Sequence, residues 1–357
     1  MRYLLLLILP LFLACQPTAQ GPISQEQIEK IDFHAHYNFP ADFLEPLLEK
    51  WRMRAVLVEV SRNDSTGIHR YWEHMQAHAA AFPDRYVLCT GFNAYGIDEA
   101  DFAEKTIRRL ETEIAAGARM VKVWKNIGMV DKDAAGNYVQ IDDPRFQPIW
   151  DFLVEKGIPV LAHIGEPIQA WRPLEEGNPH FNYFSRNPQY HAYLNLEIPR
   201  YETIIGARDN WLARNPELVV VGAHLGSTEH DVDLVAERLD RFPNFHVEPA
   251  ARFGDLARQD SRKVREFFIK YQDRILYGTD LGTSRPADEL GAEAIEARRQ
   301  DTEKMISLHW TYLSGNDTLY YDSHMVSFPI HTHSLNLPRE VLQKVYAGNA
   351  KRILKLP

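Results

Sequence analysis

From residue 30 onward, eight short apolar segments alternate with longer segments of helical periodicity. Apolar runs of this length predict buried strands, and the stretches between them predict amphipathic helices. Gly117 and Gly157 follow two of the helical segments, as expected where a helix ends before a strand. Eight strand–helix units are the number that closes a (β/α)8 barrel, so we expect an α/β fold of the TIM-barrel class. The predicted strands are 30–36, 54–61, 85–93, 118–126, 158–165, 218–226, 245–252 and 274–282.

A doubly wound open sheet is the structural alternative for the same alternation. It is disfavoured because no glycine-rich phosphate-binding turn follows the first predicted strand. Two long segments follow strands five and eight, from Pro167 to Pro199 and from Thr283 to Asn336. We expect them to be insertions that shape a substrate site, because loops at the carboxyl ends of barrel strands usually do so.

The first 15 residues are expected to be an export signal rather than part of the fold. An apolar run too short to span a bilayer as a folded helix ends at Cys15. The residues FLAC resemble the lipobox of bacterial lipoproteins, in which the cysteine carries the lipid. The expected order is a lipoprotein-type signal peptide over 1–15, a polar tether over 16–29 and the barrel domain over 30–357. Plain secretion, with an unmodified Cys15, is the alternative.

Charge and cysteine content restrict the partners of the domain. The formal net charge is −9 at pH 7, which argues against a nucleic-acid partner because no strongly basic surface is implied. Only Cys89 remains besides Cys15, so no disulfide framework is expected. No later segment is apolar and long enough to cross a membrane. We therefore expect a small-molecule partner and membrane attachment only through Cys15, in the bacterial cell envelope; nothing in the sequence selects an oligomeric state.

Two histidines lie two residues apart on the first predicted strand. His34 and His36 point to one side of the strand, whereas Ile31, Phe33 and Ala35 point to the other. We expect the apolar side to face the helices. Both histidines would then face the barrel interior near its carboxyl-end mouth.

Three further polar residues end other predicted strands. His163, His224 and Asp280 end strands five, six and eight. A single histidine at a strand end is usually a hydrogen-bonded structural residue, but several on one barrel rim are more specific. Imidazoles and a carboxylate suit Zn²⁺ or a similar divalent ion such as Mn²⁺. Such an ion lowers the pKa of bound water toward roughly 7 and polarises a substrate carbonyl.

Together these motifs resemble the amidohydrolase superfamily. In particular they are similar to the amidohydrolase-related family, which includes sugar-acid lactonases, other small hydrolases and decarboxylases. The resemblance extends over residues 31–354. The segments that carry it are HAH at 34–36, AHIGE at 162–166, GAHLGS at 222–227, LYGTD at 276–280 and AGNAKRIL at 347–354.

The resemblance implies a role for each rim residue. His34, His36, His163 and Asp280 would hold one divalent ion, zinc or else manganese. His224 would be the catalytic imidazole, which orients the nucleophile or stabilises developing negative charge. Asp280 would also move a proton.

Lys122 on predicted strand four lies opposite Val121 and Val123, so it is expected inside the barrel. In some amidohydrolases a lysine on this strand is carbamylated and bridges two metals. A binuclear site with a carbamylated Lys122 is therefore the alternative to a single ion. We favour a buried lysine paired with a carboxylate, either Glu59 or Glu248, because an unpaired buried ammonium is costly.

Five residues near the rim are candidate substrate contacts. Glu166 and Arg252 follow strands five and seven, and two tryptophans could stack on a ring or line a cavity. The full set is Lys122, Trp124, Glu166, Trp171 and Arg252.

Three functions are consistent with these residues. The leading hypothesis is a metal-dependent hydrolase that uses a metal-activated water on a lactone, ester or amide. The alternative is a metal-dependent decarboxylase of an unsaturated carboxylic acid at the same site. A non-enzymatic envelope lipoprotein is disfavoured, because a protein without activity has no reason to keep the complete ligand set.

Overall fold

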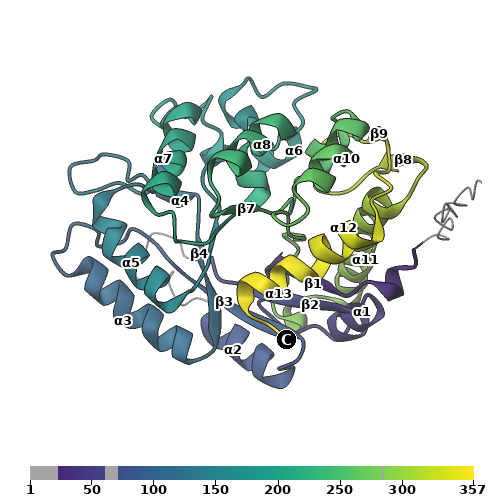
Figure 1. Ribbon diagram of the computed structural model, residues 1–357, viewed down its shortest axis with the longest axis horizontal. Coiled ribbons are helices and arrows are strands. Elements are labelled where there is room, and N and C mark those ends of the chain that lie inside the picture. Colours follow the sequence, from purple (N-terminus) through teal and green to yellow (C-terminus); the bar gives the residue numbers. More distant parts are fainter. Residues whose placement is uncertain (1–22, 61–70, 284) are drawn as a thin grey trace, which may run out of the picture.

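The computed structural model describes residues 23–60, 71–283 and 285–357. The expected signal peptide, Cys15 and residues 16–22 of the tether lie outside the described residues. Within them, seven parallel strands form one sheet in sequence order, with helices around it (Figure 1). The strands are β1 (Lys30–Ala35), β2 (Met53–Val58), β3 (Tyr86–Phe92), β4 (Ala118–Val123), β5 (Val160–Ala162), β6 (Val220–Gly222) and β7 (Phe245–Val247).

The segment predicted as the eighth strand is not a regular strand. Residues 274–282 form isolated parallel bridges instead, through Ile275 to β7 and through Gly282 to the residue that follows β1. The backbone N–H of Asp280 also donates to the carbonyl oxygen of His34, at 2.7 Å. The segment therefore lies between the two outer strands of the curled sheet. It brings Asp280 next to the first predicted histidine, as an α/β barrel of the TIM class requires.

Helices follow the strands along the chain and lie on the outside of the sheet (Figure 1). None of them, within the described ranges, is long and apolar enough to cross a membrane. They are α1 (Leu44–Lys50), α2 (Trp72–Ala81), α3 (Phe102–Ala115), α4 (Asn126–Met129), α5 (Gln147–Lys156), α6 (Phe181–Arg186), α7 (Tyr201–Arg214), α8 (Val232–Arg241), α9 (Phe253–Ala257), α10 (Ser261–Lys270), α11 (Ala292–Ser314), α12 (Arg339–Gln343) and α13 (Asn349–Leu354).

Helix α8 illustrates how the sequence determines these boundaries. The side chain of Asp231 accepts a hydrogen bond from a backbone N–H in the first turn, which satisfies one of the unpaired donors there. Val232, Val235 and Leu239 are buried, and their spacing of three and four residues forms one apolar stripe. The stripe packs against the main core.

The two long segments predicted as insertions contain secondary structure of their own. After β5, residues 164–200 contain α6 and the 3-10 turns η4 (Ile168–Trp171) and η5 (Pro188–Tyr190). After residue 282, α11 precedes an antiparallel hairpin of β8 (Thr318–Tyr321) and β9 (Ile330–His333).

The interior of the barrel corrects one expectation about β1. Ile31 and Phe33 do not face the helix layer; they pack with Met120 of β4 in the smaller of two apolar clusters. The pairing of β1 with β2 shifts between Asp32 and Ala35. Such a bulge re-aims the side chains that follow it. Ile31 and Phe33 can therefore share the interior with His34, whereas Ala35 lies in the main core.

The described end of the expected tether is packed against the barrel. Ile28 is buried in the main core, and the carbonyl oxygen of Gln25 accepts a hydrogen bond of 2.7 Å from Nζ of Lys30. Gln27 accepts another from Arg339, near the opposite end of the chain. Residues 25–28 of the expected tether are therefore in contact with the barrel domain.

Candidate active site

A cavity of about 640 Å³ contains most of the predicted site residues. Its volume is in the range of small-molecule sites. Side chains at the ends of the barrel strands line it together with residues from the segments after β5, β7 and β8. Among them are His34, His36, Lys122, Trp124, Lys125, His163, Glu166, His180, Tyr183, His224, Arg252, Asp280 and His324.

Asp280 lies against His34 of β1 and against His36, the residue that follows this strand. Its Oδ1 is 3.0 Å from Nε2 of His36 and 3.5 Å from Nε2 of His34. Nitrogen and oxygen ligands that bind one zinc ion at about 2.0–2.2 Å lie roughly 3 Å from each other. The three side chains are therefore spaced as ligands of one divalent ion.

The ring orientations of His36 and His224 also fit metal or acid–base chemistry. Nδ1 of His36 is 3.0 Å from the carbonyl oxygen of Val58, and Nδ1 of His224 is 2.7 Å from that of Ala250. A carbonyl oxygen only accepts hydrogen bonds, so each Nδ1 carries the proton. Nε2 of each ring consequently keeps the lone pair that binds an ion or accepts a proton.

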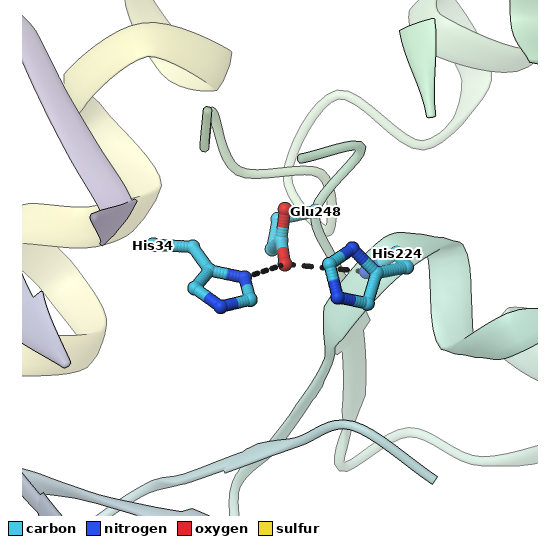
Figure 2. A group of neighbouring side chains, drawn as sticks. All are labelled: His34, His224 and Glu248. Carbon is cyan, nitrogen blue, oxygen red and sulfur yellow. Dashed lines mark hydrogen bonds and ion pairs between the residues drawn. The ribbon is translucent and has the colours of Figure 1, made fainter. Parts of the chain in front are cut away.

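Glu248, the residue after β7, connects His34 to His224 (Figure 2). Its Oε1 accepts hydrogen bonds from Nδ1 of His34 at 2.8 Å and from the backbone N–H of His224 at 3.2 Å. It is fully buried. A carboxylate bound to Nδ1 fixes the tautomer that leaves Nε2 free for an ion. Sequence reasoning named Glu248 only as a partner for Lys122, although its inward position was the signal for this role.

Replacing Glu248 by glutamine should lower metal affinity by about 10–100-fold, the usual cost of losing a carboxylate that orients a ligand histidine. The amide can accept only through one atom, whereas both carboxylate oxygens accept in the parent. Competition with a chelator measures the affinity. The control is Glu113→Gln, because Glu113 is equally buried but binds Thr90 and Arg109 instead. If Glu248→Gln bound the metal as tightly as Glu113→Gln, Glu248 would not orient a metal ligand.

The charges of these groups suit a cation. Burial lowers the pKa of His34, His163 and His224 well below the usual range of histidine, and nearby cations lower each further. Burial alone would raise the pKa of Asp280, but its contacts with the imidazoles of His34 and His36 hold that pKa well below its usual range. Neutral imidazoles and an ionised carboxylate are the forms that bind a divalent ion.

His163 is near this group but does not belong to its tightest part. The group whose ligand atoms lie within 4.8 Å of one another consists of His34, His36 and Asp280. The ring of His163 is 4.2 Å from that of His224 between centroids. Its buried Nε2 has no hydrogen-bond partner among the described residues. An unsatisfied buried polar atom costs about 1–3 kcal/mol, which binding to an ion would offset.

Lys122 lies inside the barrel and is buried. Its Nζ is 3.1 Å from Nε2 of His34. Burial lowers the pKa of Lys122 to about 8, and the charges of Glu248 and Asp280 partly oppose that shift. The lysine thus contacts a predicted metal ligand directly, while Glu248 acts on it through its charge.

The candidate substrate contacts differ in their positions. Trp124 and Arg252 line the cavity, whereas Trp171 is not among the lining residues. The indole N–H of Trp171 donates to the carbonyl oxygen of Pro199, at 3.0 Å, and so holds the segment after β5 together. Trp171 therefore does not line this cavity, and its contact with the substrate stays a prediction.

Glu166 lines the cavity but is already bound by neighbouring side chains. Its Oε1 pairs with Nζ of Lys125 and accepts a hydrogen bond of 2.9 Å from the hydroxyl of Tyr183. Nζ of Lys125 also lies 3.8 Å from the ring centroid of Tyr190. These contacts join the end of β4 to the segment after β5, and the expected contact of Glu166 with the substrate stays a prediction.

Two lining histidines are not among the predicted site residues. His180 precedes α6, and His324 lies between β8 and β9. Both belong to long connections, where no periodicity predicts which side chain turns inward. The HTH motif at 331–333 repeats the spacing of His34 and His36, but it is part of β9, and both of its histidines are exposed.

Fold and site together define a class of protein: an enzyme on an α/β barrel of the TIM class, with histidines and an aspartate at the strand ends suited to a divalent ion. A family model described as amidohydrolase matches residues 25–356, so the chain belongs to the amidohydrolase family. This family is metal-dependent, and the chain is an amidohydrolase-related enzyme. The non-enzymatic interpretation is thereby set aside.

Solved structures agree with the fold. A 2,6-dihydroxybenzoate decarboxylase from Rhizobium is 13% identical, with 92% of this chain and 99% of that chain covered and a TM-score of 0.50. A structure of a 2,6-dihydroxybenzoate decarboxylase bound to 2,6-dihydroxybenzoate is 14% identical, with 92% of this chain and 100% of that chain covered and a TM-score of 0.51. A protein described as amidohydrolase II is also 14% identical, with 92% of this chain and 100% of that chain covered and a TM-score of 0.51. No curated protein sequence matches the chain. At these identities the similarity concerns the fold alone.

Proposed function

We propose that the chain is a metal-dependent hydrolase that cleaves a lactone, ester or amide bond in a small organic molecule. The observation that carries this proposal is the ligand-like spacing of His34, His36 and Asp280, with His224 in the same cavity. Zinc is the proposed ion and manganese the alternative, because the donors are imidazole nitrogens and one carboxylate.

His34, His36 and Asp280, with His163 as a fourth protein ligand, would hold the ion. When bound, the ion would activate water and polarise the carbonyl group of the substrate. Nε2 of His224 keeps its lone pair because Nδ1 donates to Ala250. His224 therefore accepts the proton of the attacking water.

Decarboxylation of an unsaturated carboxylic acid is the second candidate, and Arg252 is the observation that favours it. This guanidinium is largely buried and lines the cavity. Its one hydrogen bond to the described residues runs to the carbonyl oxygen of Ala251, at 3.0 Å, and its Nε has no partner. A guanidinium with free donors binds a carboxylate in a bidentate manner. The decarboxylases of similar fold agree with this alternative.

A product-identified screen in ¹⁸O-labelled water tests the proposal. Zinc- and manganese-loaded protein is offered lactones, esters, amides and unsaturated carboxylic acids, and the products are weighed by mass spectrometry. Hydrolysis places one ¹⁸O atom in the acid product. Release of CO₂ from an unsaturated acid, without turnover of any lactone, ester or amide, would replace hydrolysis by the second candidate.

We also propose that Cys15 carries a lipid and that the domain works in the bacterial cell envelope. The support is the short apolar run that ends at this cysteine and the polar segment after it. The native chain should sediment with membranes, and Cys15→Ala should move most of it to the soluble fraction, because one or two acyl chains supply the membrane affinity. Fractionation with detergent controls measures this. Equal distribution of both proteins would exclude the anchor.

A further inference from the structure

A second histidine–carboxylate pair reaches the cavity of the candidate metal ligands through its histidine, His180. Nε2 of His180 lies 2.9 Å from Oδ1 of Asp255. His180 precedes α6 in the segment after β5, and Asp255 lies on α9 in the segment after β7. Both side chains are more than nine-tenths buried.

The hydrogen bond fixes the orientation of this imidazole. A carboxylate only accepts, so Nε2 of His180 donates to Asp255. Nδ1 makes no hydrogen bond with any residue that the structure describes, which leaves it as the ring atom available to a molecule in the cavity. A histidine held by a buried aspartate on one nitrogen and facing substrate with the other is arranged for proton transfer.

The surrounding charges keep the carboxylate ionised. Burial would raise the pKa of Asp255, but the adjacent His180 and then Arg252 hold it below its usual range. Glu229 completes the group within 4.8 Å, and burial raises its pKa to about 7. The positive charge of Arg252 acts on both Glu229 and Asp255, which disfavours a second divalent cation at this place.

The pair and His224 can contact one molecule. Both His180 and His224 line the cavity of about 640 Å³, which suits a single small ligand. Arg252 lies near His224 and Asp255. Burial is the largest cause of the lowered pKa of His224, and the charge of Arg252 is the next; this charge also lowers the pKa of Asp255.

We propose that His180 is a second acid–base residue of the active site, which protonates the leaving group while His224 takes the proton of water. The inference rests on the proposed hydrolysis. The water oxygen forms a bond to the carbonyl carbon, and the bond from that carbon to the leaving oxygen or nitrogen breaks. Nδ1 of the protonated His180 gives its proton to the leaving atom, and Nε2 of His224 receives one from water. Exchange with solvent then restores both imidazoles.

A purely structural role is the competing explanation, because the contact between His180 and Asp255 also joins α6 to α9. The leaving group distinguishes the two. A poor leaving group needs a proton to depart, whereas a good one departs as an anion. Loss of an acid therefore slows only the poor leaving groups, while a distorted cavity slows all of them.

The experiment compares 4-nitrophenyl, phenyl and ethyl esters of acetic, benzoic and succinic acids with zinc-loaded parent, His180→Gln and Asp255→Asn. We expect His180→Gln to lower kcat for ethyl esters by roughly 10²–10³-fold, the scale for a positioned acid. The 4-nitrophenyl esters should change by less than about threefold, because they need no acid. Asp255→Asn should also lower kcat most for the ethyl esters and least for the 4-nitrophenyl esters, but by smaller factors than His180→Gln. The matched control is His191→Gln: His191 is equally buried in the segment after β5, and its Nε2 binds the carbonyl oxygen of Arg172 outside the cavity lining.

Each other outcome has a distinct meaning. An equal loss for all three leaving groups assigns the pair to structure alone and overturns the inference. Loss of one metal ion per chain in His180→Gln assigns the group to a second ion and also overturns it. A parent that hydrolyses no ester, lactone or amide contradicts the proposed function itself, and the role of His180 with it. If His180→Gln does not fold, as judged by its thermal unfolding, the leaving-group series of Asp255→Asn decides.

Discussion

Replacing His34 and His36 together by alanine will reduce bound metal to background and lower turnover by more than about 10²-fold. Loss of an orienting partner alone costs 10–100-fold, so loss of two ligands must cost more. Oδ1 of Asp280 lies 3.5 Å from Nε2 of His34 and 3.0 Å from Nε2 of His36. Removal of both imidazoles therefore leaves this carboxylate without the neighbours that would share an ion. Elemental analysis of dialysed protein and kcat on the same preparation measure both effects.

The chain contains its own control for this change. His331 and His333 have the same alternating spacing on β9, but both are exposed. Alanine at both positions should leave metal content and kcat at the parent values. If the substitution on β1 also left the metal content unchanged, His34 and His36 would not be ligands.

The second large effect concerns His224. Asparagine keeps a polar side chain of similar shape but cannot take up and release a proton. We expect His224→Asn to retain the metal content of the parent and to lose roughly 10²–10⁴-fold in kcat, the scale for removing a positioned acid–base group. Comparison of kcat with metal per chain separates this role from ligation. A parallel fall of both quantities would make His224 a ligand.

The barrel and its rim could be predicted because strand patterns repeat. Seven of the eight predicted strands are present, since short apolar runs between helical segments leave few other folds. The alternation of side chains along predicted strand four also predicted correctly that Lys122 lies inside the barrel. The same alternation gave the wrong side for Ile31 and Phe33. The register shift in β1 that re-aims the side chains depends on pairing with β2 and not on local sequence.

Other parts of the site arise only from tertiary contacts. Residues 274–282 form bridges rather than a regular strand, although the bridges still place Asp280 beside His34. His180 meets Asp255 across 75 residues of chain, and Trp171 turns toward Pro199 instead of the cavity. Irregular connections have no periodicity that reveals such orientations.

We propose that one divalent ion binds at the strand ends and that His224 acts beside it as an acid–base group. Metal per chain in parent, His224→Asn and Lys122→Ala, measured on preparations made in parallel, tests it most directly. We predict close to one ion per chain in all three proteins. Two ions in the parent and one in each variant would contradict the claim, because His224 and a carbamylated Lys122 would then be ligands of a binuclear centre.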